Sequence, residues 1–177
     1  MQEHGLKISE LVTLFNLEVL NRGSDYDTAL LTITDVNRPG LQFHSFYDYF
    51  DPRRLQVLGK AEITYLKGLT TEQRRKCFDD LFLYDIPALV ISRGLDCFPE
   101  CLESARVHER TLLRTEETTV EFTSHTIEYL NRVLAPCVTR HGVLLDISGE
   151  GVMITGDSGI GKSESAIELI MRCLLYT

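Results

Sequence analysis

The sequence predicts an α/β fold in which a mainly parallel sheet is followed by the start of a second, smaller unit. Strand-like and helix-like segments alternate four times over residues 17–134, as in proteins whose parallel strands are joined by helices. Residues 87–94, PALVISRG, form a nearly continuous apolar run that is typical of a strand buried on both faces. Beyond Pro136 two strand-like segments follow each other directly, which indicates a different unit.

The first elements are expected to be short. Ser9 is expected to cap a helix whose apolar residues include Leu11 and Phe15, and strands are expected over residues 17–21 and 29–34. Asn37-Arg38-Pro39 then combines a capping residue with a proline, which favours a helix over residues 41–50. The aromatic residues of this segment recur at helical spacing and are expected in the core: Phe43, Phe46, Tyr47 and Phe50.

The remaining elements of the first unit follow in regular order. Thr70 and Gln73 match the pattern of a capping box, in which two side chains bond to the first backbone N–H groups of a helix. The run at residues 87–94 is expected to be the central strand. The expected order is strand 54–59, helix 60–66, helix 71–84, strand 87–94, helix 99–109, strand 112–113 and helix 119–134.

Composition limits the class of protein. The 177 residues are 44% hydrophobic and 25% charged, and 18 basic against 26 acidic residues give a net charge of −8. A negative chain is a poor partner for nucleic acid or an anionic membrane. The sequence has no apolar run long enough to span a membrane and no signal peptide at its start, so we expect a cytoplasmic protein.

The five cysteines are odd in number and include no CxxC pair, which argues against a disulfide framework or a zinc ribbon. Cys97 and Cys101 are four residues apart and are expected on one helical face, as buried thiols rather than half of a metal site. Arginine pairs at 53–54 and 74–75 could contact phosphate or an acidic partner, but charged helix faces are common and are the favoured interpretation.

The second unit begins with two strands. VLLDI at residues 143–147 and VMIT at 152–155 flank Ser148-Gly149-Glu150-Gly151, so a β-hairpin is expected. We therefore place a boundary near residues 134–140, between an N-terminal α/β domain at 1–134 and a second domain at 135–177.

A glycine-rich loop follows the hairpin. Residues 156–163, GDSGIGKS, satisfy the pattern GxxxxGK[ST], with a strand before them and the helical run KSESAIELIMR after them. A chance match in a chain of this length has a probability below about 1%. The alternative is a glycine turn that only caps a helix.

The residue types of this loop suit phosphate binding. Glycines allow the backbone to approach phosphate oxygens, and successive N–H groups at a helix start donate to them. Lys162 is placed to reach the β- and γ-phosphates, and the Ser163 hydroxyl suits Mg²⁺. Asp157 is expected to point away from the phosphates, because a carboxylate would repel them. The predicted nucleotide-binding residues are Gly156, Asp157, Ser158, Gly159, Ile160, Gly161, Lys162 and Ser163.

The residues together resemble a known family. HGVLLD at 141–146, the glycines that follow it and ITGDSGIGKSESAIELI resemble HPr kinase/phosphorylase, a bacterial enzyme that acts on a serine of the phosphocarrier protein HPr. The segments DVNRPGLQF, YFDPRRLQVLGKAEITYL, IPALVISRGL and LNRVLAP resemble the N-terminal domain of that family. The resemblance extends to about residue 172, and the second unit is then the start of a P-loop kinase domain.

The resemblance implies a bifunctional enzyme of carbon metabolism. It implies ATP-dependent phosphorylation of a serine on HPr, and attack of inorganic phosphate on phosphoserine-HPr to give pyrophosphate. ATP and Mg²⁺ would be the cofactors, Lys162 and His141 would be catalytic, and the family suggests a homohexamer.

The sequence departs from the family pattern after the first helix of the second unit. The resemblance implies that an acidic pair supplying the proton acceptor follows this helix, but only 14 residues follow Ser163. We therefore expect a truncated chain that is inactive alone. Two alternatives stay open: another P-loop kinase or ATPase with a regulatory domain, and a non-catalytic binding or assembly module.

Overall fold

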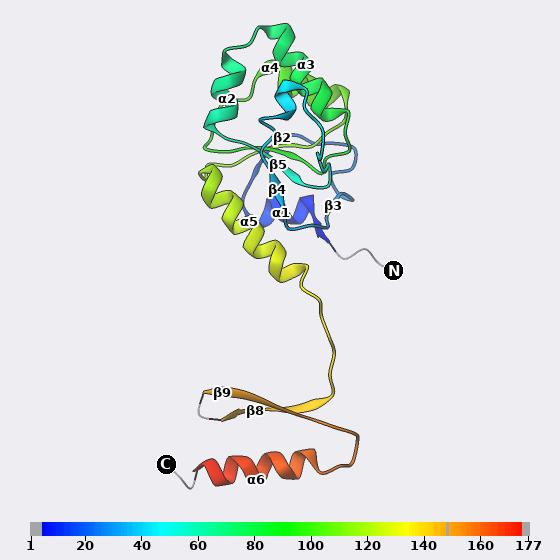
Figure 1. Ribbon diagram of the computed structural model, residues 1–177, viewed down its shortest axis with the longest axis vertical. Helices are drawn as coiled ribbons and strands as arrows, with labels where there is room; N and C mark the ends of the chain where they lie inside the picture. The colour runs from blue at the N-terminus through cyan, green and yellow to red at the C-terminus, as the bar shows by residue number, and fades with distance from the viewer. Residues whose placement is uncertain (1–4, 148, 175–177) are drawn as a thin grey trace. The chain divides into compact units, whose positions relative to one another are not determined.

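A five-stranded sheet with the order β2-β7-β6-β5-β4 lies at the centre of the N-terminal part of the computed structural model (Figure 1). The structure describes residues 5–147 and 149–174, with side chains up to residue 172. The chain divides into an N-terminal unit, Met1–Ala135, and a C-terminal unit, Pro136–Thr177. The strands of the central sheet are β2 (Glu18–Asn21), β4 (Val36–Asn37), β5 (Leu55–Leu58), β6 (Leu89–Ile91) and β7 (Leu112–Arg114).

The central sheet is mainly parallel, which confirms the predicted fold class. Strands β4, β5, β6 and β7 run parallel to one another, and only β2 at the edge runs antiparallel to its neighbour β7. Strand β6 is the middle strand and all three of its residues are buried. The apolar run at residues 87–94 is therefore the central strand that the sequence predicts.

Helices cover both faces of this sheet (Figure 1). Helices α2 (Lys60–Lys67), α3 (Thr71–Phe82) and α4 (Pro99–Val107) cover one face, and α1 (Ile8–Leu14) and α5 (Thr119–Val133) cover the other. Successive residues of a strand point to opposite faces, so Leu89 and Ile91 belong to the first core while Val90 belongs to the second. This alternation explains why the strand is apolar at every position.

Helices α3 and α5 begin with capping boxes in which the side chain of the N-cap residue also accepts a hydrogen bond. The Thr70 hydroxyl accepts a hydrogen bond from the Gln73 N–H, and the Thr70 N–H donates to Gln73 Oε1 at 3.0 Å. Thr118 and Glu121 repeat this arrangement at the start of α5. The capping box predicted at Thr70 is confirmed.

The first predicted elements differ in detail. Helix α1 begins at Ile8 and its N-cap is Lys7, so the prediction that Ser9 caps it is wrong. The strand predicted over residues 29–34 is reduced to β3 (Leu30–Leu31), which pairs with β1 (Leu6–Lys7) in a separate two-stranded sheet. Glu10 explains the earlier helix start, because its carboxylate accepts from the Lys7 N–H at 3.4 Å.

The helix predicted over residues 41–50 is wrong. Only a short 3₁₀ helix, η1 (Gln42–His44), forms there, and Ser45 and Tyr49 have positive φ angles that interrupt helical geometry. The aromatic residues cluster instead: Tyr47 and Phe50 pack on the Tyr84 ring at centroid distances of 4.8 and 5.1 Å. Of the four expected in the core, Phe43 is buried, Tyr47 and Phe50 are partly buried and Phe46 is 46% exposed.

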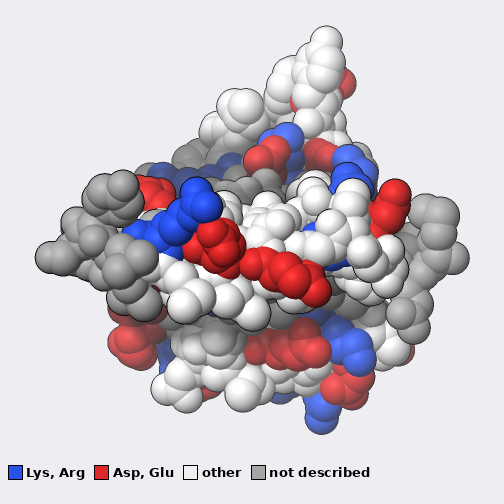
Figure 2. Space-filling model, turned by 90° about the horizontal axis from the view of Figure 1, so that it is seen from below, with Lys and Arg blue, Asp and Glu red and all other residues white. Residues whose placement is uncertain are grey.

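Both arginine pairs form ion pairs within the unit. Their partners are Asp51 for Arg53, Asp35 for Arg54, Glu100 for Arg74 and Glu103 for Arg75. This favours the interpretation as charges paired within the fold, three pairs at the surface and the Arg74–Glu100 pair largely buried, rather than a phosphate site. Figure 2 shows basic and acidic side chains interspersed on the face that it presents.

None of the described helices is long and apolar enough to cross a membrane.

The cysteines form no disulfide among the described residues. Cys77 and Cys101 are buried, Cys97 is partly buried and Cys137 is exposed. The side chain of Cys173 lies outside the described residues. Within residues 5–147 and 149–172, no group of three or more His, Cys, Asp or Glu side chains gathers in a way that could hold a metal ion.

The C-terminal unit is an antiparallel hairpin followed by one helix. Strands β8 (Gly142–Ile147) and β9 (Glu150–Thr155) pair along their whole length, and α6 (Lys162–Leu174) packs on them. The predicted hairpin and helix are confirmed. The predicted turn includes Ser148, which lies outside the described residues, and the Gly149 N–H beside it donates to Asp146 Oδ1 at 2.9 Å.

Candidate functional site

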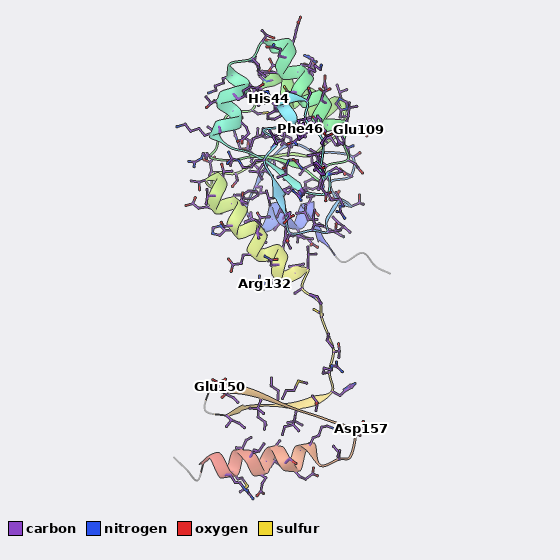
Figure 3. The ribbon with its side chains drawn as sticks, in the orientation of Figure 1. His44, Phe46, Glu109, Arg132, Glu150 and Asp157 are labelled. Atoms are coloured by element: carbon purple, nitrogen blue, oxygen red, sulfur yellow. The ribbon has the colours of Figure 1, made fainter. Side chains whose placement is uncertain are left out.

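The glycine-rich loop connects β9 to α6. In Figure 3, Glu150 marks the turn end of the hairpin and Asp157 marks the opposite end, where the chain passes to the helix. Strand β9 ends at Thr155 and α6 begins at Lys162, so the six residues between them have no regular structure. The sequence thus has the strand, loop and helix order that phosphate loops require.

The backbone of the loop depends on glycine. Gly159 and Gly161 have φ angles of +83° and +90°, in the left-handed region that residues with a side chain rarely adopt. A Cβ atom at Gly159 would meet nothing within 4 Å, so backbone conformation rather than crowding requires glycine there. The loop therefore presents bare backbone to its surroundings, as a phosphate cradle must.

The side chain of Lys162 folds back over the loop. Its Nζ donates to the carbonyl oxygen of Gly156 at 2.9 Å and to that of Asp157. The ammonium group therefore lies beside the first residues of the loop, although Lys162 itself starts the helix. The Asp157 side chain is exposed, and its backbone carbonyl rather than its carboxylate contacts the lysine.

Residues of the first turn of α6 complete the loop. Ser163 is exposed, so its hydroxyl is accessible to a ligand. The first N–H groups of a helix have no partner within the helix and carry partial positive charge. Glu164, which the motif does not include, has a carboxylate oxygen 3.8 Å from where a Cβ at Gly161 would lie. The sequence signal that could have identified Glu164 near the loop is its position in the first turn of the helix.

The hairpin register brings His141 to the loop end of the unit. Gly142 pairs with Thr155, so His141 precedes β8 at the same end at which β9 passes into Gly156. A side chain at position 142 would collide with the carbonyl oxygen of Ile154, at 2.7 Å from the Cβ position. Glycine at 142 thus permits the pairing that sets this register. His141 is exposed.

These residues fit a phosphate chain with a divalent cation. Positive-φ glycines, a helix start, an ammonium and an exposed hydroxyl are the donor set that phosphate and Mg²⁺ require. ATP would be held by the loop backbone and Lys162, and Mg²⁺ by Ser163 together with the phosphates. This set of groups binds phosphate and neutralises its charge, and none of them is a carboxylate that could accept a proton from a hydroxyl nucleophile.

Family models and curated relatives of one family match most of the chain. The family model "HPr Serine kinase N terminus" matches residues 6–130, and "HPr Serine kinase C-terminal domain" matches residues 132–176. HPr kinase/phosphorylase of Alkaliphilus metalliredigens is 46% identical over 167 residues, which are 94% of this chain and 54% of the relative. That of Clostridium perfringens strain SM101 is 44% identical over 168 residues, 95% of this chain and 54% of the relative.

The chain therefore spans about half the length of the curated relatives it matches. One solved structure matches with a TM-score of 0.51. It contains the CBS and DRTGG domains of the regulatory region of a Clostridium perfringens pyrophosphatase, complexed with the activator diadenosine tetraphosphate. The identity is 15%, and the match covers 72% of this chain and 49% of that one. This likeness concerns the fold alone.

Proposed function

The chain belongs to the HPr kinase/phosphorylase family, and we propose from this membership that its phosphate loop serves ATP-dependent phosphorylation of a serine on the phosphocarrier protein HPr. The second proposed reaction is attack of inorganic phosphate on phosphoserine-HPr, which breaks the bond between the serine oxygen and phosphorus, releases the serine hydroxyl and gives pyrophosphate. The proposed setting is a cytoplasmic homo-oligomer, a homohexamer by analogy with the family, that regulates carbon metabolism.

The loop geometry is the observation that carries this proposal. The Lys162 ammonium lies against the carbonyl oxygens of Gly156 and Asp157, at the place where the backbone turns from strand to helix. A phosphate chain offers this ammonium stronger, charged acceptors than the two carbonyls. We propose that Lys162 exchanges these carbonyls for phosphate oxygens and that the Ser163 hydroxyl holds Mg²⁺.

The same phosphate loop suits both proposed reactions. Backbone N–H groups and a lysine recognise phosphate oxygens whether they belong to ATP, inorganic phosphate or pyrophosphate. Both proposed reactions would therefore use one set of donors at residues 156–163. His141 is proposed to act in catalysis at this end of the hairpin.

Phosphoryl transfer needs more than this loop. A serine hydroxyl is a weak nucleophile, and a positioned proton acceptor contributes roughly 10² to 10⁴ in rate. The family pattern has its acidic pair in a segment after the helix that corresponds to α6. We propose that the 177-residue polypeptide binds nucleotide but does not by itself phosphorylate HPr at a normal rate.

Calorimetric titration of the 177-residue chain with Mg·ATP tests the proposal. Lys162→Ala should weaken binding about 10- to 100-fold, because a charge-assisted contact to phosphate contributes about 1.5–3 kcal/mol. Arg172→Ala is the matched control, since it removes one exposed positive charge from the same helix. Unchanged binding by the Lys162 variant would refute the assigned loop.

The Lys162→Ala variant also separates the enzyme from a non-catalytic module. HPr binding can be followed by pull-down with the wild-type chain and with Lys162→Ala. Loss of nucleotide with retained HPr binding would favour a binding or assembly role for this half of the relatives' length. Normal turnover of HPr by the 177-residue chain would contradict the proposed need for a further proton acceptor.

A further inference from the structure

Cys97 and Cys101 lie together at the start of α4. The helix begins at Pro99 with Phe98 as its N-cap, so Cys97 precedes the helix and Cys101 is its third residue. Their spacing of four predicted that they share one helical face. That prediction is wrong, because Cys97 lies before the helix. Phe98, between the two cysteines, has an extended backbone with φ −67° and ψ 140°. Cys97 packs against the core cluster that contains Cys101.

The two sulfur atoms have different surroundings. Cys101 is completely buried in the core between the sheet and α3, whereas Cys97 is partly exposed and packs against the edge of that core. The Cys97 thiol also lies 3.4 Å from the carbonyl oxygen of Phe98. Solvent can therefore reach Cys97 but not Cys101.

The electrostatics have the same asymmetry. The hydrogen bond with Cys101, followed by the charge of Arg114 and the N–H of Leu102, lowers the pKa of Cys97 in spite of its burial. Burial raises the pKa of Cys101 well above its usual value. The Glu18 carboxylate partly compensates the positive charge of Arg114, since it accepts a hydrogen bond from Arg114 Nε at 2.7 Å. The thiol of Cys97 therefore loses its proton more readily than the buried thiol of Cys101 does.

From this arrangement we propose that Cys97 and Cys101 form a reversible disulfide by reaction with a hydroperoxide. The Cys97 thiolate attacks one peroxide oxygen, so that an S–O bond forms, the O–O bond breaks and the leaving oxygen takes a proton to become water. Cys101 then loses its proton and attacks the sulfur of Cys97, forming the S–S bond and releasing a second water. The two thiols lose two electrons and two protons, and hydrogen peroxide is reduced to two molecules of water.

The site belongs to the N-terminal unit and is independent of the phosphate loop. Its disulfide would close a ring of only five residues, which constrains an unfolded chain very little. Its effect is local, because it ties the segment after β6 to the first turn of α4. This makes the pair a site of oxidative modification rather than a structural crosslink, and reducing conditions would reopen it.

Mass spectrometry of the intact chain after hydrogen peroxide treatment tests the proposal. Tryptic cleavage after Arg93 and Arg106 releases residues 94–106, which contain Cys97 and Cys101 and no other cysteine. After alkylation, this peptide should carry no alkyl group and should have lost two hydrogen atoms, and dithiothreitol should restore both thiols. Cys77 should oxidise at least about tenfold more slowly, because it is buried and the thiolate is the reactive form.

Variants assign the order of the two steps. Cys101→Ser should leave a sulfenic acid on Cys97 that dimedone labels, whereas Cys97→Ser should leave Cys101 reduced. Cys77→Ser is the matched control and should form the disulfide as the wild type does. A peptide that keeps both thiols while exposed Cys137 oxidises would overturn the proposal. Because this measurement needs only the wild-type chain, it stands even if Cys101→Ser fails to fold.

Discussion

The two units of the chain differ in what holds them together. The N-terminal unit buries apolar side chains on both faces of its sheet, and Phe78, Phe82 and Phe122 are among those fully covered. Of the buried apolar residues in the described part of the chain, only Leu145 and Ala166 belong to the C-terminal unit. That unit instead exposes apolar side chains on its hairpin, its loop and its helix: Leu144, Met153, Ile160, Ile167 and Met171.

The difference separates stability from chemistry. The unit with the large core holds no residue of the proposed nucleotide site, and the unit with that site has little core of its own. Because core burial is the dominant stabilising contribution, the N-terminal unit should account for most of the unfolding free energy of the chain. Loop residues of the C-terminal unit should affect ligand binding far more than stability.

Removal of a core ring should show the largest effect. Phe78→Ala deletes a fully buried ring that packs edge-on against Phe43 at a centroid distance of 5.9 Å. We expect a loss of about 3–5 kcal/mol in the free energy of unfolding, through lost burial and the cavity left behind. Urea unfolding can be followed by tyrosine fluorescence, because six of the seven tyrosines lie in the N-terminal unit and tryptophan is absent.

Ile167→Ala on α6 is the counterpart in the other unit. Its side chain is 60% exposed, so the change should stay within about 0.5 kcal/mol. If the two substitutions cost the same, the contrast between the units would not hold.

A buried ion pair should give a smaller, pH-dependent effect. Arg74 Nη2 lies 2.9 Å from Glu100 Oε1, and the hydrogen bond from Arg74 holds the pKa of Glu100 below its ordinary value of 4.5. Folded Glu100 thus binds protons less readily than the unfolded chain does. Its stabilisation is present above pH 4.5 and is lost as the pH falls through the lowered value.

Glu100→Gln should cost about 1–3 kcal/mol at pH 7 and should flatten the acid limb of the stability curve. Urea midpoints measured from neutral to acidic pH give both quantities. Glu168→Gln is the control, because its partner Arg172 is 71% exposed and such pairs contribute about 0–1 kcal/mol. An unchanged acid limb in the Glu100 variant would show that another carboxylate governs acid unfolding.

The same contrast explains which parts of the fold the sequence could predict. Strand β6 was predictable because both of its faces meet a core, so every position from Leu89 to Ile91 is apolar. The capping box at Thr70 was predictable because it needs only residues three apart. The segment 41–50 was not, because its aromatic residues pack against Tyr84, which is far along the chain.

The loop of the candidate site is mostly local, and its motif was therefore enough to predict the order of strand, loop and helix. Lys162 reaches the carbonyls of Gly156 and Asp157, which are only six and five residues away, respectively. The location of His141 depends on strand register, which Gly142 permits and which spacing alone does not specify. The relative position of Cys97 and Cys101 depends on where α4 begins. The prediction of a shared helical face misplaced Cys97, because α4 starts at Pro99, two residues after Cys97.

The smallest effect is expected on the outer face of the hairpin. Leu144 and Met153 lie opposite each other in the register and are 73% and 46% exposed. Leu144→Lys removes exposed apolar surface, so sedimentation velocity should detect less self-association while the tyrosine-reported free energy of unfolding stays within about 0.5 kcal/mol. A larger loss would mean that this face stabilises the N-terminal unit and that the division of stability between the units is wrong.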